Sequence, residues 1–111
     1  MKTVSKSWGR EEWLVNTELY CAKYLYINNK HSTSLHFHKT KDETFYIVSG
    51  VVCVSIEEMG EIYGNILCAG NKRRVRTRSL HKIEGRSDDA IVLEVSTHHD
   101  DTDSFRLQQE G

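Results

Sequence analysis

Proline does not occur in this chain of 111 residues, and cysteine is scarce. Without proline, a familiar marker of turns is missing, so the ends of the predicted strands rest on glycine, asparagine and aspartate. The three cysteines, Cys21, Cys53 and Cys68, form an odd set without a Cys-x-x-Cys pair. This usage argues against a disulfide framework and is typical of reduced, partly buried thiols in a cytoplasmic protein.

Strong net charge and long apolar runs are missing as well. The formal net charge is -1, which argues against attraction to nucleic acid or to an anionic membrane surface. No apolar run approaches the ~20 residues that span a bilayer, and the polar start of the chain is no secretory signal. We therefore expect neither nucleic acid nor membrane among the partners. The length predicts one domain over residues 1–111, because no room remains for a second core.

The chain does contain a series of short apolar or alternating segments that are separated by polar turns. No helical period extends beyond about two turns, so the pattern predicts an all-β fold, either a sandwich or a barrel. The polar segment 1–12 and the acidic tail 97–111 are expected to pack on this body or to be flexible. The predicted strands are 13–15, 19–27, 43–48, 51–56, 62–68 (interrupted at Gly64-Asn65), 73–77, 80–83 and 90–95.

One stretch, residues 34–50, concentrates side chains that bind metals. His36 and His38 are two residues apart, so a strand would direct both imidazoles to the same face. Glu43 lies an odd number of residues beyond His38, and the polar run 39–42 supplies a turn after which a new strand brings the carboxylate back. Two imidazoles and one carboxylate from neighbouring strands predict a divalent-metal site with open coordination positions.

The spacing of these residues, with Gly50 after them, resembles the first motif of the cupin family. The second cupin motif, in outline a glycine followed eleven residues later by a histidine, resembles the segment from Gly70 to His81. The resemblance implies a cupin domain, a jelly-roll or double-stranded β-helix barrel, with one divalent metal ion. The metal remains open between zinc, manganese, iron, nickel and cobalt. By resemblance, its ligands are His36, His38, Glu43 and His81.

A narrower likeness, to the small cupin domain of type II phosphomannose isomerases, extends over nearly the whole chain. It rests on KSWGREEWLV at 6–15, HKIE at 81–84, LEVS at 93–96, and the later Asp100, Asp101 and Arg106. Ser7, Arg76, Arg78 and Lys82 depart from the residues usual in that family. The likeness implies a metal-dependent aldose–ketose isomerase of the mannose 6-phosphate type that acts on a phosphorylated sugar. It also implies a homodimer paired through edge strands.

Two other functions are compatible with the same ligand set. An Fe(II) cupin oxygenase would use the open coordination positions for O₂. A non-catalytic sugar-binding module would bind its ligand in a saturable manner without turnover.

Two further residues are candidates for the substrate site. Residues 72–78 carry five positive charges. If Val75 faces the barrel interior, as its position in the second cupin motif implies, alternation turns Arg73 inward as well, where a guanidinium needs an anion. Arg73 is therefore a candidate ligand for a substrate phosphate or carboxylate, with a buried ion pair to Glu94 as the alternative. Glu94 interrupts an apolar strand. It is either a charge on the solvent face or the group that moves protons in the isomerase.

Two remaining patterns have both a functional and a structural interpretation. His98 and His99, followed by two aspartates, indicate a second metal site or, preferably, a flexible polar tail. Several aromatic side chains could stack on a sugar ring, although packing in the core or a dimer is the default for such residues. These aromatic residues are Trp8, Trp13, Tyr20, Tyr24 and Tyr26.

Overall fold

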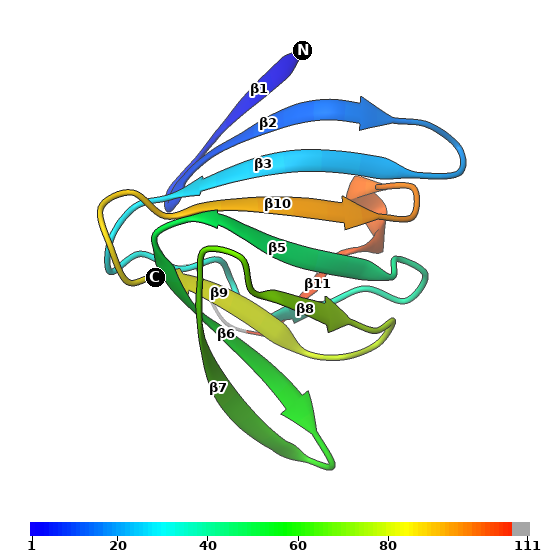
Figure 1. The fold of residues 1–111 in the computed structure, drawn as a ribbon. Helices are drawn as coiled ribbons and strands as arrows, with labels where there is room; N and C mark the ends of the chain where they lie inside the picture. Colours follow the sequence, from blue (N-terminus) through cyan, green and yellow to red (C-terminus); the bar gives the residue numbers. More distant parts are fainter. Residues whose placement is uncertain (108–111) are drawn as a thin grey trace.

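Two antiparallel β-sheets face each other in the computed structural model, which describes residues 1–107 (Figure 1). The strand order is β1-β2-β3-β10-β5-β8 in the first sheet and β11-β4-β9-β6-β7 in the second. From β3 onward the chain crosses repeatedly between the sheets, as in a jelly roll. The elements are β1 (Lys2–Lys6), β2 (Gly9–Asn16), β3 (Cys21–Ile27), β4 (His36–Phe37), β5 (Glu43–Ser49), β6 (Val51–Glu58), β7 (Glu61–Cys68), β8 (Lys72–Val75), β9 (His81–Gly85), β10 (Ile91–Ser96), the 3-10 helix η1 (Asp101–Asp103) and β11 (Phe105–Arg106).

The all-β prediction is confirmed, and the predicted strands from residue 19 to residue 95 are present with small shifts at their ends. The predicted interruption at Gly64-Asn65 is wrong, because β7 pairs with β6 without a break from Glu61 to Cys68. The Asn65 side chain, which suggested a turn, donates a hydrogen bond to the backbone oxygen of Val54 on the neighbouring strand. A turn-forming residue is thus accommodated inside a ladder.

The polar segment 1–12 is not an appendage but the edge of the first sheet. β1 forms a hairpin with β2, from the pair Lys2 and Trp13 to the pair Lys6 and Gly9. Gly9 has a φ of 150°, and a side chain at this position would collide with the backbone oxygen of Tyr26 on β3. Trp8, in the hairpin turn, is buried in the core with 3% of its surface exposed. One aromatic anchor therefore holds an otherwise polar segment in place.

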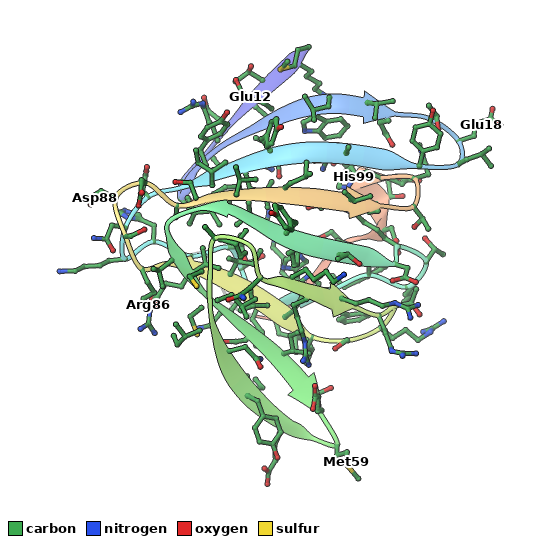
Figure 2. The ribbon with its side chains drawn as sticks, in the orientation of Figure 1. Glu12, Glu18, Met59, Arg86, Asp88 and His99 are labelled. Carbon is green, nitrogen blue, oxygen red and sulfur yellow. The ribbon has the colours of Figure 1, made fainter. Side chains whose placement is uncertain are left out.

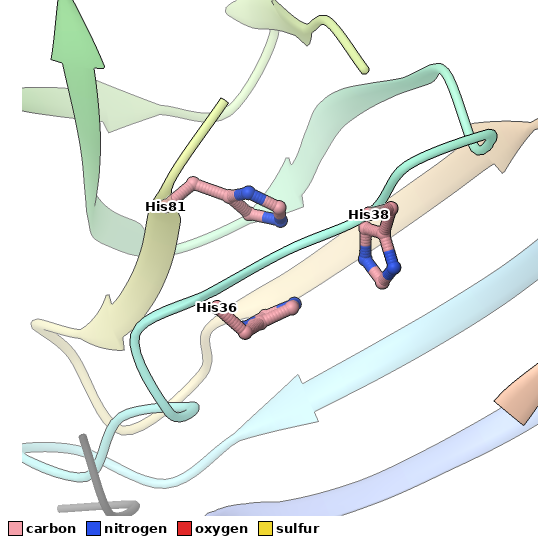
Figure 3. A group of neighbouring side chains, drawn as sticks. All are labelled: His36, His38 and His81. Atoms are coloured by element: carbon pink, nitrogen blue, oxygen red, sulfur yellow. The ribbon is translucent and has the colours of Figure 1, made fainter. Parts of the chain in front are cut away.

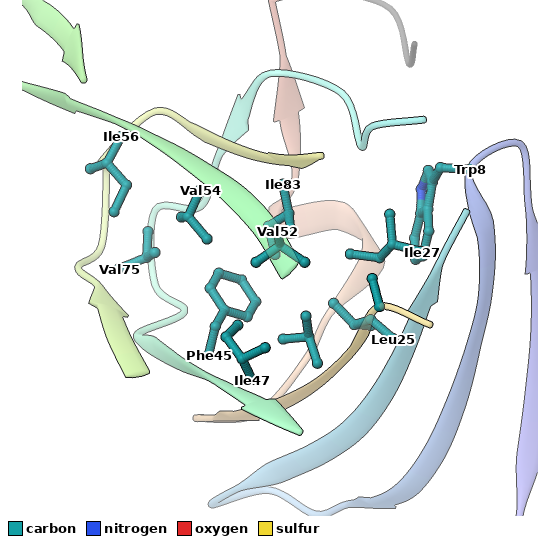
Figure 4. Packing of buried hydrophobic residues seen from close by; sticks show 12 residues of the cluster. Trp8, Leu25, Ile27, Phe45, Ile47, Val52, Val54, Ile56, Val75 and Ile83 are labelled. Carbon is teal, nitrogen blue, oxygen red and sulfur yellow. The ribbon is translucent and has the colours of Figure 1, made fainter. Parts of the chain in front are cut away.

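The hydrophobic core lies between the two sheets and draws on both (Figure 4). Along β5 the inward residues Phe45 and Ile47 are 2% and 0% exposed, whereas the outward residues Tyr46 and Val48 are each 42% exposed. This alternation is the pattern expected for a strand with one buried face. The buried cluster consists of Trp8, Leu25, Ile27, Phe45, Ile47, Val52, Val54, Ile56, Val75, Ile83, Ala90 and Val92.

The acidic tail is bonded to the rest of the protein up to residue 107. The Asp103 carboxylate accepts hydrogen bonds from the backbone N–H groups of Lys39, Thr40 and Lys41, and from the Thr40 hydroxyl. β11 then pairs with β4, and Phe105 stacks on Phe37 with 5.2 Å between the ring centroids. Of the two expectations for the tail, packing holds for residues 97–107, and residues 108–111 lie outside the described part.

Two findings bear on the expectations from composition. All three cysteines are unpaired; Cys21 and Cys53 are buried, and Cys68 is exposed. Within residues 1–107, no helix has the length and apolar character that crossing a bilayer requires.

Candidate metal centre

Three histidines converge between the two sheets (Figure 3). His36 lies on β4 directly opposite His81, the first residue of β9, and His38 follows β4. One ring nitrogen from each histidine lies within 4.8 Å of those from the other two. The second sheet therefore brings together imidazoles that are more than forty residues apart in sequence. The arrangement could hold one metal ion.

Each imidazole is held in orientation by a hydrogen bond between its Nδ1 atom and a backbone oxygen. His36 Nδ1 lies 2.7 Å from the backbone oxygen of Ser34. His38 Nδ1 lies 2.7 Å from that of Asp103, and His81 Nδ1 lies 2.9 Å from that of Ser79. Because a carbonyl oxygen only accepts, each Nδ1 must carry the proton and donate. The neutral tautomer that results leaves the Nε2 lone pair of each ring for a metal, as is usual for ligating histidines.

Glu43 supplies a carboxylate to the same place. It is the first residue of β5, after the turn 39–42, so the reversal predicted from the sequence occurs. Its Oε1 lies 3.4 Å from His81 Nε2 and its Oε2 lies 3.4 Å from His38 Nε2. Glu43 Oε2 and His81 Nε2 are buried and have no hydrogen-bond partner. Two lone-pair atoms without a donor at one point fit a bound cation, which would satisfy both.

The electrostatics favour the protonation states that metal binding needs. Burial, together with the neighbouring His81, lowers the pKa of His36 to about 3. Burial also lowers the pKa of His38, even though the Glu43 carboxylate opposes the shift. For Glu43 itself, burial alone would raise the pKa, but the contact with His81 and the charge of Lys41 outweigh burial and lower the pKa. His36 and His38 are therefore neutral and Glu43 is ionised at neutral pH. His81 is the exception: burial alone would lower its pKa, but the Glu43 carboxylate outweighs burial and raises it, so a metal ion at this position competes with a proton.

A second pair of buried charges adjoins the centre. Lys41, 3% exposed, places Nζ 2.5 Å from Glu94 Oε2 and 3.6 Å from Glu43 Oε2. Its third neighbour is His99, whose Nδ1 lies 3.0 Å away. Lys41 was predicted only as a turn residue, because nothing in a polar run of four shows which side chain is buried. The ammonium group links the carboxylate at the metal centre to a second carboxylate in the same cavity.

These groups line a cavity of about 350 Å³ between the sheets, a size typical of small-molecule sites. Its wall combines the histidine cluster with carboxylates, cations and a few apolar side chains. Besides the four predicted ligands, the wall includes Lys6, Trp8, Glu11, Lys23, Lys41, Phe45, Glu94, His99, Asp101 and Arg106.

Glu94 lies inside this cavity and is 6% exposed, so the solvent-facing interpretation is wrong. On β10 the inward residues are Val92, Glu94 and Ser96, while Leu93 and Val95 point outward. Alternation alone could not decide which set faces the core, because the outward side chains are the more apolar ones. Of the two interpretations of Glu94, the structure therefore supports a position beside the candidate metal site.

The Arg73 side chain points to the predicted face of the sheet, but its ion-pair partner is not the predicted one. It pairs in register with Phe45, so its side chain leaves the sheet on the inner side, as alternation predicts. Its guanidinium forms an ion pair with Glu58 of β6, however, and not with Glu94, and it does not line the cavity of the histidines. The expected contact with a substrate bound at the metal is therefore not supported by its position.

Of the two tail histidines, His99 lines the cavity and His98 does not. His99, labelled in Figure 2, lies within 2.8 Å of the Asp101 carboxylate and contacts Trp13 edge-on. His98 Nδ1 lies 2.7 Å from the backbone oxygen of Thr17. Within residues 1–107, neither belongs to a cluster of converging metal-ligating groups. The interpretation as a second metal site is not supported.

The aromatic residues divide between core and surface. Of the five that were considered for sugar stacking, Trp8 lines the cavity and also lies in the core. The Trp13 indole donates a hydrogen bond to Glu11, and Lys23 Nζ lies 4.0 Å from the centre of its ring. Packing therefore explains Trp8 and Trp13 without a sugar.

No protein-family model and no curated protein matches this chain. Solved structures do match. KdgF from Halomonas sp. is 19% identical over 84% of this chain and 81% of its own, with a TM-score of 0.74. The capsular polysaccharide assembling protein CapF from Staphylococcus aureus is 18% identical over 96% of this chain and 32% of its own, with a TM-score of 0.82. Oxalate decarboxylase from Bacillus subtilis is 19% identical over 96% of this chain and 30% of its own, with a TM-score of 0.85.

These neighbours are cupin-fold proteins, so the predicted jelly-roll barrel is confirmed: this chain has the cupin fold. It spans about a third of the length of the CapF and oxalate decarboxylase chains. Because the sequence identities to these three structures are below 20%, the likeness establishes the fold and not the function.

Removing one ligand tests the metal centre. We expect His38→Ala to weaken the binding of Zn²⁺ or Mn²⁺ by at least about a hundredfold, since even the hydrogen-bond partners of metal ligands contribute ten- to a hundredfold. His31→Ala is the matched control, because the His31 side chain is exposed and its Nδ1 lies 3.1 Å from the backbone oxygen of Asn29, away from the histidine cluster. Calorimetric titration of the metal-free proteins measures both. Equal affinities for wild type and His38→Ala would contradict the assignment.

Proposed function

We propose that this protein is a metal-dependent aldose–ketose isomerase that acts on a small phosphorylated sugar, as its likeness to the type II phosphomannose isomerases implies. The observation that carries the proposal is the buried carboxylate of Glu94 beside the histidine cluster, in a cavity large enough for a sugar. An isomerase must move a proton between adjacent carbons, and Glu94 is an acid–base group within the cavity. One protein of the same fold, CapF, is named for the assembly of a capsular polysaccharide, which fits carbohydrate chemistry.

The candidate metal centre would hold its ion through His36, His38, Glu43 and His81. A divalent ion at this position would polarise a sugar carbonyl as a Lewis acid and make the proton on the adjacent carbon more acidic. The imidazole and carboxylate donors suit zinc, manganese, iron, nickel or cobalt.

The residues next to this centre account for the proton transfer. The Glu94 carboxylate would take the proton from the hydroxyl-bearing carbon beside the carbonyl and return it to the former carbonyl carbon, while the hydroxyl proton moves to the former carbonyl oxygen. Lys41, 2.5 Å from Glu94, holds the carboxylate in place. Because the pair is buried, water is excluded from the carbon that exchanges its proton.

The substrate phosphate requires cations at the cavity wall. Arg73 lies outside this wall, whereas Lys6, Lys23 and Arg106 line it. Lys23 is 1% exposed and lies 3.7 Å from Glu11. We propose that these cations replace Arg73 in the role that the sequence suggested for it.

Glu94→Gln tests the function. The amide keeps the shape of the side chain but cannot accept the carbon-bound proton, so kcat should fall by about a hundredfold or more while the bound metal remains. Glu84→Gln, on a half-buried glutamate outside the cavity, is the control and should be unchanged. Conversion of mannose 6-phosphate in D₂O, followed by NMR, reports both turnover and the uptake of solvent deuterium.

The outcomes of this experiment separate the three candidate functions. Isomerisation that requires Glu94 supports the proposal. Saturable sugar binding without turnover would replace it by a non-catalytic binding module. Oxygen consumption by the iron-loaded protein without isomerisation would replace it by an oxygenase. Full activity of Glu94→Gln would refute the role of that residue.

We also propose that the chain forms a homodimer through the outer face of the first sheet. One row of cross-strand partners crosses this face in register, and its centre is apolar or aromatic while its two ends carry opposite charges. The row is Glu12, Tyr24, Leu93, Tyr46 and Lys72. Tyr46 is 42% exposed and the neighbouring Val95 is 50% exposed, and a second copy would cover both.

Glu12 and Lys72 lie two strands to either side of β10, so a twofold axis parallel to β10 would exchange their positions between two copies. Such an axis places Glu12, labelled in Figure 2, over Lys72 of the second copy and brings the apolar centres together. The opposite ends of one copy are therefore complementary to those of another.

A charge-reversal series tests this dimer by sedimentation velocity. Lys72→Glu should shift the equilibrium towards monomer, because two carboxylates would then face each other. Glu12→Lys combined with Lys72→Glu should restore the dimer, since the charges are again complementary. A monomeric wild-type protein, or a double variant no more associated than Lys72→Glu, would contradict this interface.

A further inference from the structure

A second hollow, of about 460 Å³, opens beside β8 and the turn that follows it. Its wall is dominated by four arginines and shares no residue with the cavity of the histidines. The other lining residues are Ile56, Glu57, Glu58, Thr77 and Ser79, and the arginines are Arg73, Arg74, Arg76 and Arg78. Neither the candidate metal centre nor the proposed isomerisation uses this concentration of guanidinium groups.

Two of the four arginines are already paired with acids. Arg74 donates two hydrogen bonds to the Asp42 carboxylate, at 3.1 and 2.6 Å. Arg73 forms an ion pair with Glu58, but its Nε is buried and has no hydrogen-bond partner. Arg73 thus retains a donor that is shielded from solvent and that an oxygen atom in the hollow would satisfy.

The other two guanidinium groups are available. Within residues 1–107, the side chains of Arg76 and Arg78 form no ion pair or hydrogen bond with the protein. Glu57 is the one lining carboxylate without an ion pair in the described part, and it offsets only one of these two positive charges. The hydroxyl of Thr77, between the two arginines in sequence, adds a neutral donor.

The turn that carries these arginines is held in position. The Arg78 N–H donates to the backbone oxygen of His38, and the Ser79 N–H donates to that of Arg76 at 3.2 Å. The Ser79 hydroxyl donates to the backbone oxygen of Glu57 at 3.3 Å. A fixed turn limits the entropy that its arginines lose when they bind a ligand.

We propose that this arginine hollow binds a phosphate group of a small molecule, at a site separate from the metal centre. Guanidinium forks match the oxygens of a phosphate in a bidentate manner, and a phosphate monoester carries about -1.5 to -2 charges near neutral pH. The two unpaired guanidinium groups outnumber the single unpaired carboxylate of Glu57, so the hollow keeps a net positive charge for the anion. Glu58 pairs with the Arg73 guanidinium in the absence of the anion. Glu58 and the anion therefore compete for this guanidinium.

Calorimetric titration of the metal-free protein with pyrophosphate, inorganic phosphate and glucose 6-phosphate at fixed ionic strength tests this site. We expect Arg76→Gln and Arg78→Gln each to weaken pyrophosphate binding at least tenfold. Glu58→Gln should strengthen it, because Arg73 is then released. Arg86→Gln is the control: this arginine pairs with Glu84, lies outside the hollow, and should leave the affinity unchanged.

Several results would overturn the site. These are no binding of any of the three anions by the wild type, an equal loss in Arg86→Gln, or weaker binding in Glu58→Gln. A loss of anion binding in His38→Ala with no loss in Arg76→Gln would place the anion at the metal centre. Stronger binding of glucose 6-phosphate than of both inorganic anions identifies a phosphorylated metabolite as the ligand, and the reverse order identifies a free inorganic anion. The isomerase proposal stands or falls independently, because its test variant, Glu94→Gln, leaves this hollow unaltered.

Discussion

The buried carboxylate of Glu43 is the constraint on which the site depends. A carboxylate with 3% of its surface exposed is costly unless cations or donors surround it. Here two imidazoles contact its oxygens at 3.4 Å, and the Lys41 ammonium lies 3.6 Å away. These contacts still leave one of its oxygens without a hydrogen bond. A divalent cation would satisfy this oxygen, and the three candidate histidine ligands converge beside it.

The fold meets this constraint with backbone groups as much as with side chains. The three histidines owe their tautomers to carbonyl oxygens, one of which belongs to Asp103 in the tail. The carboxylate of the same Asp103 binds the turn between His38 and Glu43. The tail therefore orients His38, a candidate ligand, and also the turn between His38 and Glu43. This dual contact explains why a polar segment after the last long strand packs on the barrel.

The local part of the site was predictable from the sequence. The separations between His36, His38 and Glu43 are short, and strand alternation with one turn determines their relative placement. The cupin motif added His81, which reaches His36 through strand pairing that no local pattern reveals. The fold class was predictable for the same reason, because strands of about six residues separated by turns admit few architectures.

The parts that sequence reasoning missed depend on contacts between distant segments. Glu94 was ambiguous because the outward face of β10 is apolar, so hydrophobicity did not indicate which side is buried. Arg73 faces inward as predicted, yet it lies at the end of the barrel where Glu58, and not the metal centre, is its neighbour. Lys41 and Asp103 gave no signal, since Glu94 and His99 lie more than fifty residues from Lys41, and the turn that Asp103 binds lies about sixty residues from Asp103.

The most direct test of the central claim is X-ray absorption spectroscopy of the protein loaded with one equivalent of Zn²⁺. We expect a first shell of nitrogen and oxygen at about 2.0–2.2 Å, with outer-shell scattering that fits three imidazoles. A sulfur shell near ~2.3 Å, or a fit with one imidazole or none, would contradict the convergence of His36, His38 and His81 on a single ion.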